Sequence, residues 1–215
     1  RQARVTISSE TAGRIVDLKI ADNMVVKQGD VLFAVDPQPY RIALAQADAA
    51  LAQARLQVEQ LRAAYGQAET QVRTAEGEVR YFTEQLDRQR ELSGKGVATK
   101  AALDSAARDL LKAQDAKAAA DDAIASARAA LGGDPTIATD GPPAVMAALA
   151  AREKAAYQLS QTTVRAPADG IVSQASSFKL GQFVTAGTSL FSLVETGDVW
   201  VEANFKETQL THMKV

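Results

Sequence analysis

Residues 40–92, YRIALAQADAALAQARLQVEQLRAAYGQAETQVRTAEGEVRYFTEQLDRQREL, decide the fold of this 215-residue chain. Through this stretch, which contains no proline, apolar side chains recur every seven residues, and a second stripe rich in alanine follows three positions later. The first stripe consists of Leu44, Leu51, Val58, Tyr65, Val72, Val79 and Leu86, and the second of Ala47, Ala54, Leu61, Ala68, Ala75, Phe82 and Gln89. A strict seven-residue period predicts a long helix that packs in a left-handed coiled coil.

The helical pattern ends at a turn and then begins again. Gly94 and Gly96 terminate the first helix, and Thr99 is placed to cap a second helix that starts at Lys100. The second arm continues the two stripes with Leu103, Leu110, Lys117, Ile124 and Leu131 and with Ala106, Ala113, Ala120 and Ala127. We therefore expect an antiparallel hairpin whose alanine-rich seam, interrupted once by Lys117, lets the two helices approach closely.

A second break covers residues 132–143, GGDPTIATDGPP, whose glycines and prolines no helix tolerates. The helical pattern resumes over about residues 144–161, so the two arms match in length only if the break loops out. Each arm would then extend about 80 Å. Two interpretations of the loop stay open: an inert bulge or a surface that faces a partner.

The segments before and after the hairpin carry the same pattern. Gly13 and Ile15 recur as Gly170 and Val172, and a second block recurs one residue further along. In that block Val26, Gly29, Leu32 and Phe33 correspond to Val184, Gly187, Leu190 and Phe191. Each half is typical of short strands separated by turns, and neither half alone could bury its apolar face. The two halves must pack together, and the hairpin returns the chain to make that possible.

Composition excludes several classes of function. The chain has no cysteine and one histidine, so it has no thiol nucleophile, no thiolate metal site and no histidine-rich ligand set. Its 24 Lys+Arg against 26 Asp+Glu provide no basic field for nucleic acid. Neighbouring acids such as Asp121 and Asp122 fall on an exposed helix, without the enclosed site that catalysis needs. We expect no enzyme, no cofactor and no metal.

The motifs at the two ends resemble a known family. Residues 13–40 contain Gly-x-Ile…Asn-x-x-Val-x-x-Gly-Asp-x-Leu-Phe-x-x-Asp-Pro-x-x-Tyr, and residues 164–172 contain Val-Arg-Ala-Pro-x-Asp-Gly-x-Val. Both resemble the split lipoyl-type domain of bacterial periplasmic adaptors, the HlyD or membrane-fusion-protein family. Residues 199–210 are similar to the strand that enters the β-barrel of EmrA-like multidrug adaptors.

The resemblance implies an elongated α+β chain of four parts. A first half of a lipoyl-like β domain, 1–38, is followed by the coiled-coil hairpin, 39–162, with its tip near 93–99 and a loop-out at 132–143. The second half of the lipoyl-like domain is 163–195, and 196–215 is the truncated start of a β-barrel domain. The resemblance also implies an N-terminal membrane anchor that precedes this chain.

In this family a tip motif, Arg-x3-Leu-x6-Ser, docks onto the outer-membrane channel. Arg88, Leu92 and Thr99 have that spacing here, with Thr in place of Ser. The resemblance implies that these three residues contact the channel. The alternative is structural: Arg88 is a solvated helix residue, Leu92 closes the last seam layer and Thr99 is an N-cap.

The function implied is that of a non-enzymatic periplasmic adaptor in a tripartite multidrug efflux system of a Gram-negative bacterium. It would be anchored to the inner membrane, would form a homo-oligomer, and would bridge a major-facilitator transporter and a TolC-like channel. One alternative is an adaptor of a type I protein-secretion system. A more remote one is a lipoyl or biotinyl carrier subunit, which needs a target lysine where the helical hairpin lies.

Overall fold

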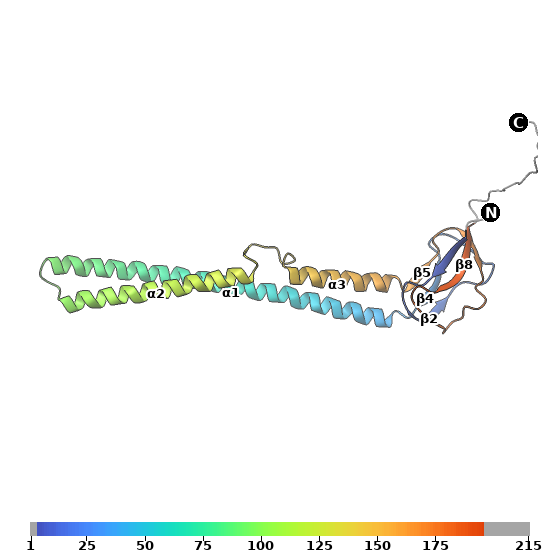
Figure 1. The fold of residues 1–215 in the computed structure, drawn as a ribbon, viewed down its shortest axis with the longest axis horizontal. Helices are drawn as coiled ribbons and strands as arrows, with labels where there is room; N and C mark the ends of the chain where they lie inside the picture. The colour runs from blue at the N-terminus through green and yellow to red at the C-terminus, as the bar shows by residue number, and fades with distance from the viewer. Residues whose placement is uncertain (1–3, 196–215) are drawn as a thin grey trace, which may run out of the picture. The chain divides into compact units, whose positions relative to one another are not determined.

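The computed structural model describes residues 4–195, which form two compact units (Figure 1). Of the described residues, the first unit comprises 4–47 and 151–195, and the second comprises 48–150. The predicted start of a β-barrel, 196–215, and the EmrA-like stretch 199–210 lie outside the described residues.

The first unit is built from two four-stranded antiparallel sheets. Its strands are β1 (Arg4–Ser8), β2 (Gly13–Leu18), β3 (Val25–Val26), β4 (Val31–Val35), β5 (Thr163–Arg165), β6 (Gly170–Ser173), β7 (Phe183–Val184) and β8 (Ser189–Glu195). The strand orders are β1-β8-β6-β3 and β5-β4-β2-β7. Each sheet therefore combines strands from both ends of the chain.

The two halves are related by an internal pseudo-twofold, in which β1 to β4 correspond to β5 to β8. Equivalent hydrogen bonds repeat across it. The Gly29 amide donates to the Ala166 carbonyl at 2.9 Å, and the equivalent Gly187 amide donates to the Ser9 carbonyl at 2.8 Å. Because β3 pairs only with β6 and β7 only with β2 among the described strands, each half completes the sheet of the other. The predicted repeat is confirmed.

The core lies between the sheets and uses equivalent positions of both halves. Its buried residues are Ile7, Ile15, Val26, Leu32, Phe33, Val35, Ala166, Val172, Ala175, Phe178, Val184, Phe191 and Leu193. The ring of Phe33 packs edge-on against those of Phe178 and Phe191, with centroids 4.9 and 6.1 Å away. Such pairs add to the stabilisation from burial alone.

Three helices separate the β halves: α1 (Gln38–Gly94), α2 (Lys100–Ala130) and α3 (Pro143–Ser160). Within the second unit, α2 and the start of α3 run beside α1 (Figure 1). The buried positions of α1 and α2 fall on the predicted stripes: Leu51, Val58, Ala68, Ala75 and Leu86 of α1, and Ala113 and Ala120 of α2. The α+β fold class with its helical hairpin is confirmed. No helix among residues 4–195 is long and apolar enough to cross a membrane.

Both ends of the helical insertion are attached by tyrosines to the segment that connects β1 and β2. Near the start of α1, the Tyr40 hydroxyl donates to the Ala12 carbonyl at 2.7 Å. Near the end of α3, the Tyr157 hydroxyl donates to the Glu10 carboxylate at 2.7 Å. This hydrogen bond raises the pKa of Tyr157, because the carboxylate accepts a proton that ionisation would remove.

Candidate partner-contact site at the helical turn

The turn between α1 and α2 is closed by main-chain hydrogen bonds. The Val97 amide donates to the Leu92 carbonyl at 2.9 Å, and the Gly96 amide donates to the Ser93 carbonyl at 3.0 Å. Gly96 has a φ of +77°, the left-handed conformation in which helices commonly end and which glycine adopts without penalty. Gly96 therefore ends the helix directly after Gly94, within the turn that the sequence predicted.

Thr99 is the N-cap of α2. Its φ and ψ of −79° and 155° are extended, and its hydroxyl accepts the Ala102 amide at 3.2 Å. The predicted capping role is thus confirmed. The side chain is also exposed, so this role leaves its surface available to a partner.

Arg88 and Leu92 lie one turn apart on the same side of α1. Arg88 is exposed, and within the described part of the chain no ion pair involves it. Leu92 is half-buried, as expected of the last layer of the seam. Whether Arg88, Leu92 and Thr99 contact a channel stays a prediction.

Two ion pairs lie close to Arg88 at the end of α1 and the start of the turn. Lys95 lies 2.5 Å from Glu91, and Arg90 lies 3.2 Å from Asp87. Exposed pairs of this kind contribute little to stability, but they neutralise neighbouring charges. Arg88 is therefore a free cation beside neutralised pairs, which suits recognition of an acceptor on another protein.

Val97 is a further surface feature of the turn, and the sequence analysis did not single it out. Its side chain is 72% exposed, more than any other large apolar residue among those described. The sequence signal that could have identified Val97 is its place between the turn glycine and the helix cap, where a β-branched residue has no neighbouring helix to cover it.

A shallow groove of about 440 Å³ also lies between α1 and α2 near the turn. It is lined by Tyr81, Phe82, Gln85 and Gln89 of α1 and by Ala102, Ser105, Ala106 and Asp109 of α2.

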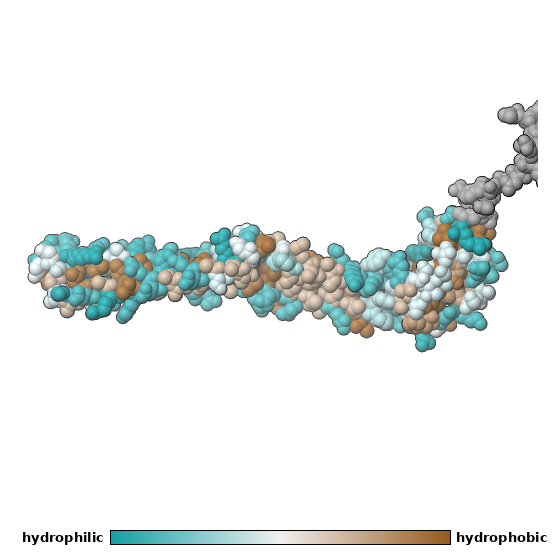
Figure 2. All heavy atoms as spheres, viewed as in Figure 1, coloured by the Kyte–Doolittle hydropathy of each residue, from teal (hydrophilic) through white to brown (hydrophobic). Residues whose placement is uncertain are grey.

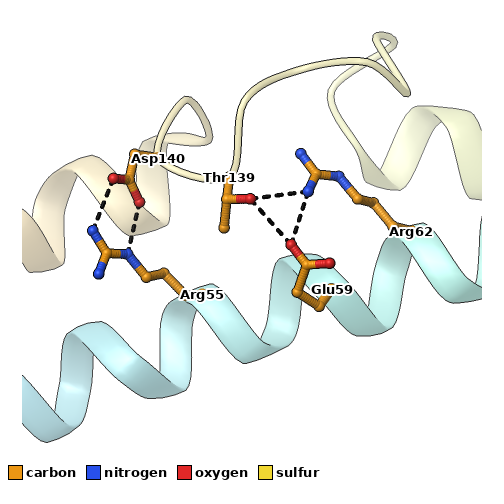
Figure 3. A network of polar contacts seen from close by, with 5 residues as sticks. All are labelled: Arg55, Glu59, Arg62, Thr139 and Asp140. Carbon is orange, nitrogen blue, oxygen red and sulfur yellow. Dashed lines mark hydrogen bonds and ion pairs between the residues drawn. The ribbon is translucent and has the colours of Figure 1, made fainter.

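The break between α2 and α3 is an ordered loop, residues 131–142, held against α1 (Figure 3). Arg55 donates two hydrogen bonds to the Asp140 carboxylate, at 2.7 and 2.8 Å. Arg62 donates to the Glu59 carboxylate at 2.8 Å and to the Thr139 hydroxyl at 2.9 Å. We call Arg55, Glu59, Arg62, Thr139 and Asp140 the loop clamp. The Arg55 hydrogen bonds lower the pKa of Asp140 and raise that of Arg55.

Apolar contacts support the loop at its two ends. Leu131 is 3% exposed, and Val145, in the first turn of α3, is fully buried against Leu51 and Val58. α3 begins at Pro143, because proline suits the first helical position, where no amide donor is needed. The loop is therefore anchored by polar and apolar contacts to one stretch of α1.

Lys117, the interruption in the seam, has acidic neighbours on both helices. Its ammonium lies 2.7 Å from Asp121 on α2 and 3.9 Å from Glu76 on α1. These carboxylates raise the pKa of Lys117, chiefly through the hydrogen bond to Asp121. Of these two partners only Glu76 lies on the other helix, so only that contact depends on the register of α1 and α2.

No group of three or more His, Cys, Asp or Glu side chains that could hold a metal occurs among residues 4–195. On the face seen in Figure 2, the helices carry hydrophilic residues mixed with the pale brown of weakly hydrophobic ones.

Comparisons with known proteins agree with this architecture. Residues 3–196 match the family described as RND MFP, barrel-sandwich hybrid domain, where MFP denotes membrane fusion protein. The chain is 37% identical over 211 residues to the fatty acid resistance protein FarA of Neisseria gonorrhoeae, covering 98% of this chain and 53% of FarA. It is 32% identical over 213 residues to the multidrug export protein EmrA of Haemophilus influenzae, covering 99% of this chain and 53% of EmrA.

The chain thus spans about half the length of these two curated relatives. A solved structure of the periplasmic adaptor protein EmrA aligns with 100% of this chain and 79% of that one, at 16% identity and a TM-score of 0.48. The family predicted from the motifs at the two ends is confirmed by the match over residues 3–196. With two interlocked β halves and a helical hairpin between them, the chain belongs to the membrane fusion protein family.

Proposed function

We propose that this chain is the central part of a periplasmic adaptor in a tripartite multidrug efflux system. It bridges an inner-membrane transporter of the major-facilitator type and a TolC-like outer-membrane channel, and it has no catalytic role. The observation that carries the proposal is the insertion of a helical hairpin, with an exposed turn, between two halves of one β unit in a membrane fusion protein.

The names of the relatives support the efflux role. EmrA is named a multidrug export protein and FarA a fatty acid resistance protein. We assign to this chain the broader of these roles, export of several small molecules.

The hairpin suits a bridge because its two arms stabilise each other along the alanine stripes. Alanine has the highest helix propensity and allows close approach, so a narrow pair of helices stays helical with little buried area per residue. The turn then presents a small surface with Arg88, Val97 and Thr99 exposed. One such surface buries little, so several copies acting together are needed to hold a channel.

The remaining parts follow from the same proposal. Residues 1–38 and 163–195 form the lipoyl-like domain, 39–162 the hairpin, and 196–215 the beginning of a β-barrel domain. An N-terminal segment outside this chain anchors the adaptor to the inner membrane of a Gram-negative bacterium, and the domains lie in the periplasm. Copies of the adaptor assemble into a homo-oligomer.

Site-specific cross-linking in cells tests the bridge. The 215 residues contain no cysteine, so Leu92→Cys and Thr99→Cys can be introduced singly into the full-length protein. Glu69→Cys, at an exposed position in the middle of α1, is the matched control. Cross-links from the two turn positions, but not from Glu69→Cys, to an outer-membrane channel would support the proposal. Turn cysteines that capture only other adaptor copies, or nothing, would contradict it.

A further inference from the structure

The pseudo-twofold of the first unit allows its two halves to be compared position by position. β7 is an edge strand of one sheet, and β3 is the equivalent edge strand of the other. Equivalent turns precede them: Asn23 has a φ of +63° where Gly181 has +82°. Each residue of one half can therefore be compared with the residue at the equivalent position of the other half. Because the backbone is the same at both positions, it does not require the two side chains to differ.

We define the β7 face as Arg14, Val16, Lys179, Leu180 and Phe183. Phe183 pairs with Arg14 in the register of β7 with β2, and Val16 follows on β2. Phe183 is 65% exposed, Leu180 63% and Val16 49%. Exposed large apolar side chains that gather in this way mark an interaction site.

We define the β3 face as the equivalent residues Ile171, Ser173, Ala21, Asp22 and Val25. Val25 is 68% exposed and pairs with Ile171 in the register of β3 with β6. Where the β7 face has Leu180, this face has Asp22, and where the β7 face has Lys179, it has Ala21. Val25 occupies the position equivalent to Phe183, and the apolar Ile171 occupies the position equivalent to Arg14.

The charges of the two faces are opposite in sign. Arg14 and Lys179 on the β7 face have no ion pair among the described residues. On the β3 face, one Asp22 carboxylate oxygen accepts the Ala175 amide at 3.2 Å, and no cation within the described residues pairs with this carboxylate. The β7 face therefore carries two cations without an ion pair and the β3 face one carboxylate without an ion pair, each beside exposed apolar groups. The two faces are complementary in charge.

From this complementarity we infer that the β7 face of one copy docks onto the β3 face of the next copy of the same chain. The contact covers Phe183 with the apolar side chains around Val25 and brings Arg14 and Lys179 toward Asp22. Because the two faces differ, the contact is heterologous and repeats from copy to copy, as a ring requires. The inference rests on the self-association in the proposed function and names the surface that produces it.

Disulfide trapping with two populations tests the assignment. Full-length protein with one epitope tag carries Phe183→Cys, and full-length protein with a second tag carries Val25→Cys. The two are co-expressed and oxidised in cells, with untagged wild-type pairs as background. We expect mixed-tag disulfide dimers at least about tenfold above those of either variant expressed alone, because only the mixed contact brings the two thiols together.

Other results would overturn the inference. Equal dimer formation by Phe183→Cys alone would indicate a symmetric contact of two β7 faces. Capture of a protein of different mass by Phe183→Cys would assign the face to another partner. If no mixed dimer forms in cells where an amine-reactive cross-linker still traps wild-type oligomers, the copies associate through surfaces other than these two faces. If that cross-linker traps no oligomer, the proposal that the protein self-associates is itself contradicted.

A second measurement uses no cysteine chemistry. Phe183→Gln should weaken self-association of the purified full-length protein by about tenfold or more in sedimentation velocity, as loss of an interface anchor does. Ile42→Gln is the matched control, because Ile42 is an apolar side chain of the same unit with 58% exposure and lies on α1. Equal effects of the two substitutions would contradict the inference.

Discussion

Gly170→Ala tests how the two β halves are locked together. Gly170 begins β6, and β6 pairs with β8, which also pairs with β1. A Cβ atom at residue 170 would lie 2.6 Å from the Val194 carbonyl oxygen and 2.9 Å from the Leu193 side chain. The carbonyl belongs to the backbone of a central strand, so it cannot rotate away as a flexible side chain would.

The magnitude follows from the shift required. Ordinary contact begins near 3.4 Å, so the Val194 carbonyl must retreat by about 0.8 Å, which disturbs the ladders on both sides of β8. Insertion of a methyl group into a packed interior of this kind costs about 1–3 kcal/mol. For a unit of roughly this size, each kcal/mol lowers the melting temperature by about 4–8 °C.

The assay is thermal and urea unfolding followed by circular dichroism, with hydrogen exchange to assign the loss to the β unit. Gly66→Ala is the control, because a Cβ there has no neighbour within 4 Å and the residue lies on the exposed side of α1. That substitution should stabilise the helix by about 0.5–1 kcal/mol. A Gly170→Ala protein as stable as the wild type would refute the close approach of β6 and β8 and the reasoning built on it.

Three further predictions concern the helical unit. Thr99→Ala should destabilise the start of α2 by about 0.5–2 kcal/mol, measured by urea unfolding, whereas Thr99→Ser should not; equal stability of the two would contradict the N-cap. Val145→Ala should cost about 2 kcal/mol in the same assay, because it leaves a cavity beside Leu51 and Val58, with the exposed Met146→Ala as its control. The pKa of Asp140 is lowered from its ordinary value of 3.8, so the Arg55 contact stabilises the loop above about pH 4 and is lost as pH falls through the lower folded-state pKa. Amides of residues 131–142 should therefore lose protection as the pH falls through that lowered pKa, and in Asp140→Asn they should have lost it already at pH 7. Protection that is the same in both proteins at pH 7 would show that the clamp does not hold the loop.

The helices and the repeat were predictable because their signals are local or self-repeating. The stripe through Leu51 and Val58 is visible in any window of two heptads, and its burial is confirmed. The correspondence of Phe33 with Phe191 shows in the sequence because equivalent places in a core need similar side chains. The capping role of Thr99 depends on neighbours only three residues away.

The loop clamp was not predictable in the same way. Arg55 and Asp140 are 85 residues apart, and nothing near either residue indicates the other. Sequence reasoning found the break in the helix but left the loop as an open question. Its attachment to α1 depends on the alignment of α3 with α1, which Val145 helps to set from a buried position.

The sequence by itself determined that this protein has a coiled-coil hairpin between two β halves, and which sides of α1 and α2 are buried. It did so because a heptad period and a duplicated motif are properties of the order of residues. Only the tertiary structure decided that each sheet takes strands from both halves, and that Phe183 at the edge of one sheet lies beside Arg14. The reason is physical: the strand pairs between the two halves join residues about 130–190 positions apart, and their contact depends on how the chain closes in space.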